Sequence, residues 1–393
     1  MRVTILSAPV GAGHDIAARR VASELEARGA TVEVVDGLEL IGSRIERLVI
    51  DGYRFQLSRA AWSWRVTYAY SRSPLVMRAV GGVLGRLGQR RLEGHLAAAG
   101  PDLVVSTYPL VSAALASLRR RGRVAMPIVT LITDFDAHPA WVHSDLDANL
   151  SVAGSSAGVL GVRPPVEACR EASPEGVRDR LGLAEGERLV LIVGGTWGVG
   201  SLHEAATAVE QVAGVRAIVV TGHNEELRAR MCGDPRLTRS IVFGFRDDLL
   251  DLIAASDVII QHAGGMTCLE AFALRVPVVM FHPVLGHGVS NAACMAQAGV
   301  AITAGDGPEL GRLLADPAFW GETAPAMVTE AAGLLAQPTL GDRVDALNPL
   351  ATVMRRPRQV ARLALGAAVS LAVLVAVEDK ADAAVHAIRL LLP

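Results

Sequence analysis

The chain has 393 residues, which is enough for two domains that each bury a core of their own. Its formal charge at pH 7 is −2, and its four cysteines are scattered with no CxxC pair. That pattern argues against a disulfide framework and against a cysteine-ligated zinc site, and it favours a reducing compartment. The opening run VTILSAPV (3–10) predicts a first β-strand rather than a signal peptide, so we expect a cytoplasmic protein.

A strand–glycine turn–helix unit occurs twice along the chain. After the first strand comes GAGH (11–14), and then Ala18, Val21, Ala22 and Leu25 recur at helical spacing until Gly29 ends the helix. The run RLVLIVGGTWGVGS (188–201) has the same order of strand and glycine turn before a helix. We expect Ser201 and Glu204 to form a capping box at the start of that helix. Further apolar strands alternate with helices, which predicts parallel sheets covered on both faces.

We therefore expect an α/β protein of two doubly wound Rossmann-like domains facing a cleft. Proline and small residues cluster between residues 161 and 176, where the seam should lie. We assign residues 1–165 to an N-terminal domain and 166–340 to a C-terminal domain. In this fold class, ligands bind at the carboxyl ends of the strands.

The segment from residue 52 to residue 92 contains eight arginines and no acidic residue. Six of the 16 aromatic residues lie between positions 53 and 70. Arginine mixed with Trp and Tyr suits a surface that meets anionic lipid headgroups. Nucleic acid would also attract such a segment, and a solvated helical hairpin would need no ligand at all. We favour the membrane and expect no nucleic acid partner; the residues assigned to this surface are Arg59, Trp62, Trp64, Arg65 and Arg72.

Residues 341–393 read as a basic and then apolar tail. The basic run 355–362 precedes 15 uncharged residues, 363–377, which as a helix would span about 22 Å, less than the ~30 Å hydrocarbon core of a bilayer. A shallow membrane helix and a helix packed on the protein are equally good alternatives, and both are better supported than a membrane span.

The first glycine loop does not match a dinucleotide-binding fingerprint. G-x-G-x-x-G would need a third glycine where the chain has Ile16, although Asp36 could serve as the ribose acid. The loop still opens a helix, whose N-terminus carries a positive partial charge. A histidine there resists protonation, so His14 is a candidate general base; the alternative is a loop histidine that binds a backbone group.

The loop QHAGGMTCLEA (261–271) has the features of a diphosphate site. Its glycines let backbone N–H groups approach a diphosphate, and the following helix adds its dipole. Glu270 lies one turn into that helix, where its carboxylate could accept from ligand hydroxyls. The chain has no Walker sequence. One carboxylate beside a phosphate site fits a nucleotide sugar.

A set of motifs then follows in a fixed order: GAGH (11–14), PDLVVSTYPL (101–110), ITDFDAHPAWVH (132–143), VGGTWG (193–198), VTGHNEEL (220–227), GFRDDLLDLIAASDVIIQHAGGMTCLEA (244–271) and PVLGHGVSN (283–291). Together they resemble the monogalactosyldiacylglycerol synthase branch of the GT-B glycosyltransferases, family 28 type. The resemblance covers about residues 3 to 310. It implies the GT-B architecture, with residues 1–165 as the N-terminal acceptor- and membrane-binding domain and residues 166–340 as the C-terminal domain that binds a UDP-sugar. It implies an inverting, metal-independent enzyme without a cofactor, which transfers a hexose from a UDP-sugar to a lipid hydroxyl such as that of diacylglycerol.

The same resemblance implies a role for each matching residue. His14 is implied as the base that deprotonates the acceptor. The glycines of its loop and the TD…HP.W segment are implied to line the acceptor side, through Gly11, Gly13, Thr133, Asp134, His138 and Trp141. Residues implied to hold the donor are Gly195, Thr196, Phe245, Gly264, Gly265, Thr267, Glu270 and Asn291. The protein would lie peripherally on the inner face of the cell membrane.

Two departures from the family keep alternatives open. The family's donor loop usually reads PGQE followed by GN, whereas here it reads VLGHGVSN (284–291), with His287 at the position that would touch the donor sugar. The diphosphate loop reads HAGGMT rather than KAGPGT. A transferase for a soluble or lipid-linked acceptor, a UDP-sugar 2-epimerase and a non-enzymatic sensor remain alternatives. Asp134 and Asp136 also spell D-x-D, but we expect no metal because the donor machinery lies in the other domain.

Overall fold

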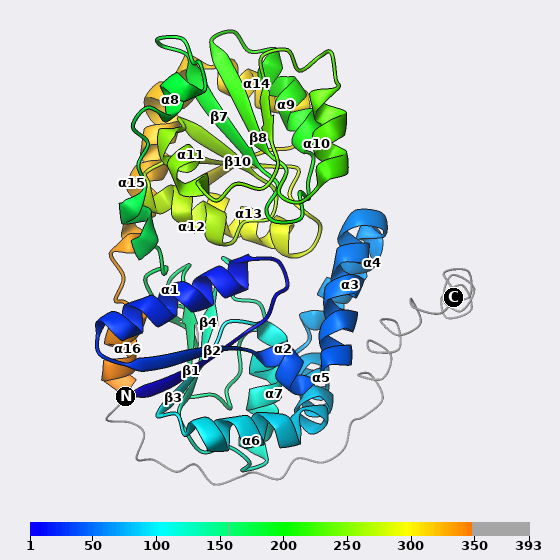
Figure 1. Ribbon diagram of the computed structural model, residues 1–393, viewed down its shortest axis with the longest axis vertical. Coiled ribbons are helices and arrows are strands. Elements are labelled where there is room, and N and C mark those ends of the chain that lie inside the picture. Colours follow the sequence, from blue (N-terminus) through cyan, green and yellow to red (C-terminus); the bar gives the residue numbers. More distant parts are fainter. Residues whose placement is uncertain (157, 348–393) are drawn as a thin grey trace, which may run out of the picture.

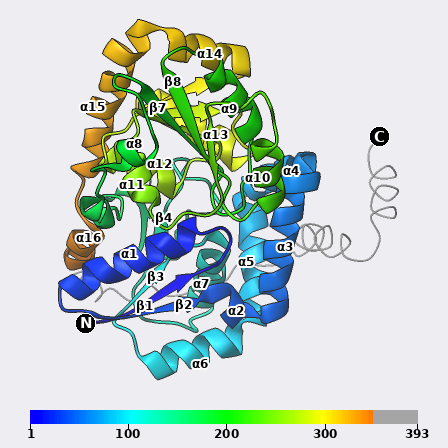
Figure 2. The same ribbon diagram turned by 45° about the horizontal axis from the view of Figure 1, so that its top comes forward.

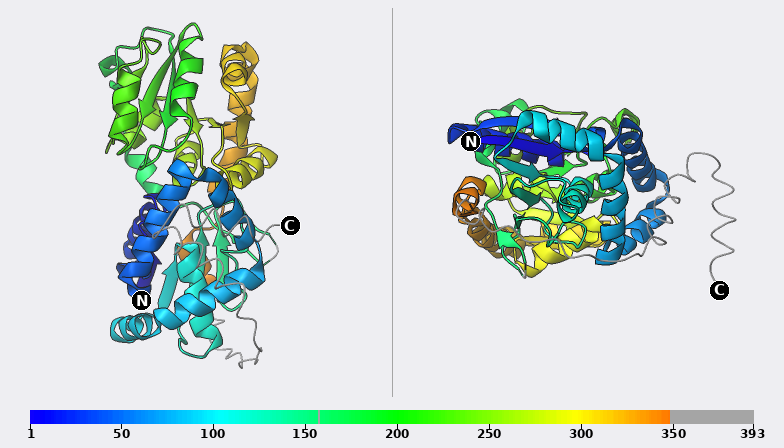
Figure 3. Two further views of the ribbon diagram at one scale, coloured as in Figure 1. Left: turned by 90° about the vertical axis from the view of Figure 1, so that its right-hand side faces the viewer. Right: turned by 90° about the horizontal axis from the view of Figure 1, so that it is seen from below.

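The computed structural model describes residues 1–156 and 158–347. These form two lobes stacked along the long axis of the molecule (Figure 1), and the side view in Figure 3 shows the same division. Each lobe contains a six-stranded sheet whose strand pairs are all parallel. The expected class, an α/β protein of two doubly wound domains, is confirmed.

The N-terminal sheet has the strand order β2-β1-β3-β4-β5-β6. Its inner strands are buried along their whole length, as continuous apolar runs require when helices cover both faces. The predicted helical stripe Ala18, Val21, Ala22 and Leu25 is buried, and Gly29 follows the helix with φ +83°. The strands are β1 (Arg2–Ser7), β2 (Thr31–Asp36), β3 (Leu103–Ser106), β4 (Ile128–Ile132), β5 (Ala148–Ser151) and β6 (Leu160–Gly161); the main covering helices are α1 (Gly13–Ala27) and α7 (Pro109–Arg120).

A helical insertion joins β2 to β3. Its helix α5 packs on α7 so closely that a Cβ at Gly81 would lie 2.4 Å from the carbonyl oxygen of Ala113. The first long helices of the insertion run up beside the lower edge of the other lobe (Figures 1 and 2). The insertion consists of α2 (Gly37–Ile41), α3 (Ser43–Arg59), α4 (Ala61–Ser71), α5 (Pro74–Leu87) and α6 (Gln89–Ala99).

The C-terminal sheet has the order β12-β11-β10-β7-β8-β9, so its topological switch lies between β7 and β10. Ser201 is the N-cap of α9, but the expected capping box does not form, because Glu204 accepts from the backbone N–H of Gly307 at 3.2 Å instead. The elements are β7 (Arg188–Val193), α9 (Leu202–Glu210), β8 (Val215–Val220), α10 (Glu225–Cys232), β9 (Ile241–Phe243), α11 (Leu249–Ala255), β10 (Val258–Gln261), α12 (Met266–Ala273), β11 (Val278–Phe281), α13 (His287–Gln297), β12 (Ala301–Ala304), α14 (Gly307–Ala315), a π-helix (Phe319–Thr323) and α15 (Ala324–Leu335).

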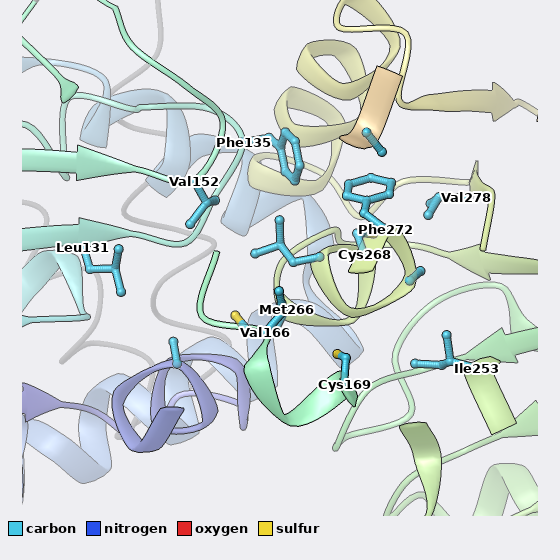
Figure 4. Packing of buried hydrophobic residues seen from close by; sticks show 14 of the residues in the cluster. Leu131, Phe135, Val152, Val166, Cys169, Ile253, Met266, Cys268, Phe272 and Val278 are labelled. Carbon is cyan, nitrogen blue, oxygen red and sulfur yellow. The ribbon is translucent and has the colours of Figure 1, made fainter. Parts of the chain in front are cut away.

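A continuous apolar cluster connects the lobes. Phe135 meets Phe272 edge-on with ring centroids 5.9 Å apart, and Val166 and Cys169 of the linker pack into the same cluster, as Figure 4 shows. The linker contains a 3-10 turn (Glu167–Glu171) and α8 (Val177–Arg180).

The chain returns to the N-terminal lobe through α16 (Leu340–Leu347), where Arg28, the C-cap of α1, pairs with Asp342 at 2.5 Å. The basic run 355–362 and the apolar run 363–377 lie outside the described residues. Within residues 1–156 and 158–347, no helix is both long and apolar enough to cross a membrane.

Candidate functional site

The carboxyl ends of the two sheets face each other across the junction between the lobes. From the N-terminal lobe come the loops after β1, β3 and β4, and from the C-terminal lobe come the loops after β7, β10 and β11. Contacts join them directly: a Cβ at Gly13 would lie 3.9 Å from the Met266 side chain, and Asn291 bonds to the loop after β4. Ligands of doubly wound proteins bind at this end of a sheet.

His14 occupies the first turn of α1, where the glycine loop delivers it to the junction. Its ring is half-buried between Tyr108, met edge-on at 5.1 Å, and Trp141 at 5.8 Å. Among the described residues, Nδ1 is buried without a hydrogen-bond partner. Burial lowers the pKa of His14 below 6.5, and the negative charge of Asp134 opposes that shift. The ring is therefore neutral at pH 7 and can accept a proton.

Asp134 is held from both lobes. Its Oδ2 accepts from Trp141 Nε1 at 2.9 Å, and its Oδ1 accepts from Asn291 Nδ2 at 3.1 Å. The carboxylate is thus fixed near His14, where it would stabilise the charge of a protonated ring. The sequence placed Asp134 and Trp141 on the acceptor side; the structure adds that Trp141, which is buried, orients the carboxylate.

Asn291 connects the two halves of the site. It is fully buried in α13, and its amide nitrogen donates to both Asp134 and the carbonyl oxygen of Ala263. Its amide oxygen accepts from the backbone N–H of Asp136 at 3.0 Å. A Cβ at Gly264 would lie 3.1 Å from the Asn291 side chain, so the glycine loop packs tightly on this residue.

The glycine loops after β7 and β10 in the C-terminal lobe present mainly backbone. Gly264 and Gly265 have φ values of +83° and +77°. Gly265 is the N-cap of α12, and no side chain caps the first turn of this helix, which contains Thr267. Uncapped N–H groups at a helix start suit an anion. The loop after β7 adds Gly195 at φ +65° and Thr196, whose carbonyl oxygen accepts from the N–H of His223 at 2.9 Å.

Glu270 lies one turn into α12 and is 4% exposed. Its Oε1 pairs with Arg20 Nη2 of α1 at 2.5 Å, across the junction between the lobes. Burial raises the pKa of Glu270, and Arg20 opposes that shift. The sequence singled out Glu270, but it gave no indication of Arg20.

Phe245 follows β9 with its ring 49% exposed. The ring is stacked on His223 at 4.5 Å with an interplanar angle of 6°. These residues form a flat aromatic surface at the carboxyl ends of β8 and β9, next to the loop that contains Thr196.

The residues that the sequence assigned to one membrane surface lie on two faces of the insertion. Trp64 faces inward, with its ring 5.9 Å from His287 and its Nε1 2.9 Å from where a Cβ of Gly286 would be. Arg72 pairs with Asp136 at 3.2 Å. Trp62, which is 59% exposed, and Arg65 lie on the opposite face of α4. Arg59 ends α3, and its side chain lies outside the described part of the chain.

His138 is packed into the protein. Its Nδ1 accepts from the N–H of Ala140 at 3.1 Å, its Nε2 lies 3.4 Å from Ser71 Oγ, and its ring lies on Tyr68. Both ring nitrogens therefore have protein partners, and His138 fixes α4 to the loop after β4. Gly11, with φ +72°, gives the turn before α1. In the described parts of the chain, no group of three His, Cys, Asp or Glu side chains could hold a metal ion.

Comparison with solved structures identifies the fold. The chain matches spinosyn rhamnosyltransferase SpnG with a TM-score of 0.61 at 15% identity, covering 88% of this chain and all of that one. It matches the glycosyltransferase SnogD from Streptomyces nogalater with a TM-score of 0.58 at 18% identity, covering 89% of this chain and 99% of that one. Two facing doubly wound lobes of this kind are the GT-B fold.

Family models specify the branch. The model of monogalactosyldiacylglycerol (MGDG) synthase matches residues 14–154, and that of the glycosyltransferase family 28 C-terminal domain matches residues 189–306. The chain is a GT-B glycosyltransferase whose two lobes match the MGDG synthase and family 28 models, as the resemblance in its motifs predicted. Relatives named processive diacylglycerol beta-glucosyltransferase, from Bacillus cereus and Bacillus thuringiensis, are 26% identical over 330 residues, which cover 79% of this chain and 83% of theirs.

Proposed function

We propose that the protein transfers a hexose from a UDP-sugar to the hydroxyl of a membrane lipid such as diacylglycerol, with inversion at the anomeric carbon. The observation that carries the proposal is the placement of a neutral, half-buried His14 beside Asp134, across the junction from the uncapped start of α12. A base on one side and an anion site on the other are what an inverting transfer requires. The names of the sequence relatives support the lipid acceptor.

In the proposed mechanism His14 takes the proton of the acceptor hydroxyl as its oxygen attacks the anomeric carbon. The bond from that carbon to the diphosphate oxygen breaks, and UDP leaves on the opposite face of the sugar. Asp134 stabilises the protonated ring, and the N–H groups around Gly264 and Gly265 receive the negative charge of the diphosphate. Closure of the lobes would exclude water from the activated sugar.

The donor would lie along the C-terminal lobe. The exposed ring of Phe245 suits the nucleobase, the carboxylate of Glu270 suits the ribose hydroxyls, and Gly195, Thr196 and Thr267 line the diphosphate region. UDP-sugar is a substrate, and we propose no separate cofactor or metal. His287 would meet the sugar itself, so the identity of the hexose depends on a residue that departs from the family pattern.

The outer face of α4 would bind the membrane. Exposed residues recur at positions 62, 65, 66, 69 and 70, which places them on one helical stripe. The stripe includes Trp62, Arg65 and Tyr70, a combination of aromatic and basic side chains that suits an anionic interface. We propose that this stripe holds the protein peripherally on the inner face of the cell membrane.

The proposal is tested by product analysis with a panel of UDP-sugars and diacylglycerol in anionic vesicles. We expect UDP release and a β-linked glycolipid from one α-configured donor, and no transfer to a soluble aglycone. UDP release that ignores lipid would favour a soluble acceptor. Formation of a 2-epimer of the donor sugar, or binding of UDP-sugar without turnover, would contradict the transferase.

A further inference from the structure

Arg20 of α1 connects the catalytic helix to the donor helix α12. The residue is one of two adjacent arginines in the middle of α1, and its side chain is only 14% exposed. Its Nη2 lies 2.5 Å from Glu270 Oε1, and its Nη1 lies 3.5 Å from the carbonyl oxygen of Pro165 in the linker. The guanidinium therefore joins the N-terminal lobe, the linker and the C-terminal lobe at one point.

Glu270 uses its two carboxylate oxygens differently. Oε1 is occupied by Arg20, whereas no hydrogen bond reaches Oε2 within residues 1–156 and 158–347. Oε2 is not fully buried, so solvent reaches it. One oxygen is anchored inside the protein, and the other is open to accept from a ligand.

The surroundings of Glu270 make its ionisation depend on Arg20. The thiol of Cys169 lies 4.0 Å from the main-chain oxygen of Glu270, and Cys268 is buried on the same helix. Burial raises the pKa of Cys169 to about 12 and also raises that of Cys268, so both thiols are neutral. Among residues 1–156 and 158–347, Arg20 is then the cation that faces this buried carboxylate. A protonated Glu270 would present a weaker acceptor to ribose hydroxyls.

We propose that Arg20 is a positioning residue for the donor: it keeps Glu270 ionised and aims Oε2 at the ribose, although Arg20 itself touches no substrate. The inference rests on the proposed role of Glu270 in binding the ribose. It implies that the N-terminal lobe, which holds the base, also sets the affinity for the nucleotide bound by the other lobe.

The test compares the binding of UDP with that of 2′-deoxy-UDP by calorimetry, from pH 6 to pH 9. The full-length wild type should prefer UDP by about tenfold or more, the value of a hydrogen bond to a charged acceptor. In Arg20→Met the preference should be smaller at pH 6 than at pH 9, because burial raises the pKa of Glu270 and Arg20 no longer opposes that shift. Arg20→Lys, which keeps a cation, should retain most of the preference, and the exposed neighbour Arg19→Met should match the wild type.

The variant Glu270→Gln distinguishes the role of Glu270 in binding the ribose from the role of Arg20 in positioning Glu270. If Glu270→Gln keeps the preference for UDP, the ribose role of Glu270 is wrong. If Glu270→Gln loses the preference and Arg20→Met keeps it at every pH, Arg20 does not position the carboxylate. An equal, pH-independent weakening of both nucleotides in Arg20→Met would show that Arg20 only supports the fold. Thermal unfolding of Arg20→Met and Arg20→Lys, run beside each titration, identifies any loss of folded protein.

Discussion

The two lobes share a fold but bring different chemistry to their junction. The N-terminal loops present side chains with rings and charges, such as His14, Tyr108 and Asp134. Apart from the stacked rings of Phe245 and His223, the C-terminal loops present mainly backbone, with glycines at positive φ that let the main chain approach a ligand. Those glycines are Gly195, Gly198, Gly200, Gly222, Gly264, Gly265 and Gly286. One lobe is thereby suited to proton transfer and the other to holding an anion, so function follows from the loops rather than from the sheets.

Each lobe contains a buried histidine that should make stability depend on pH in the same way. Burial lowers the pKa of His143 in the N-terminal lobe and of His262 in the C-terminal lobe to about 4. Because the unfolded chain binds these protons near pH 6.5, stability should fall as the pH drops from 6.5 to 4, on the order of 3 kcal/mol per histidine. Urea unfolding at pH 7.5 and 4.5 measures the loss. His143→Gln should lose less stability than the wild type over that interval, and an equal loss would contradict the assignment.

The backbone character of the C-terminal loops is tested at Gly222. A Cβ there would lie 2.2 Å from the carbonyl oxygen of Gly195, and φ is +58°. Gly222→Ala should therefore lower the free energy of unfolding by about 3 kcal/mol and weaken UDP binding. The control is Gly214→Ala, which also has positive φ but meets open space, and it should cost only about 1 kcal/mol. Equal losses in thermal or urea unfolding would show that close packing at Gly222 is unimportant.

The side-chain character of the N-terminal loops is tested at Asp134. Asp134→Asn should reduce kcat about ten- to a hundredfold, because the protonated His14 loses its counter-charge. The wild-type rate should fall only below pH 6.5. In the variant this acid limb should move to lower pH still, since Asp134 raises the pKa of His14. Asp145→Asn, which breaks an ion pair with Arg120, is the control and should change neither quantity. An acid limb that moves upward would refute the electrostatic link.

The smallest expected effect concerns the outer face of α4. Arg65→Ser should weaken binding to anionic vesicles about fivefold, the contribution of one basic residue near a charged surface. Flotation of vesicles at two ionic strengths measures it, and the loss should shrink at the higher salt. Arg230→Ser on α10 of the other lobe is the matched control. If both variants bind equally well, the membrane does not meet the protein through α4.

Local signals were sufficient to predict the fold. Apolar runs alternating with helices gave the parallel sheets, and the stripe that ends at Gly29 gave the first helix correctly. The glycine loops were recognised because a positive φ strongly favours glycine, largely independently of the tertiary surroundings. The expected capping box at Ser201 failed because Glu204 found a tertiary partner, the N–H of Gly307, which lies 103 residues away.

The internal connections of the site could not be predicted in this way. Arg20 and Glu270 are 250 residues apart, and no local pattern marks them as partners. The inward face of Trp64 was missed for a different reason. A count of the aromatic residues in the insertion does not show which face of the helix each one occupies. The spacing of positions 62, 65, 66, 69 and 70 is a signal that could have separated Trp64 from Trp62.

The most direct test of the account is lipid-dependent transfer by His14→Ala and His14→Gln, measured as glycolipid formed per enzyme in anionic vesicles. UDP affinity is measured on the same samples. We predict that kcat falls by a factor on the order of 10²–10⁴ while UDP binds as it does to the wild type, because the base acts on the acceptor alone. Transfer that survives in both variants would contradict the assignment of His14 as the base and leave its loop a binding element only.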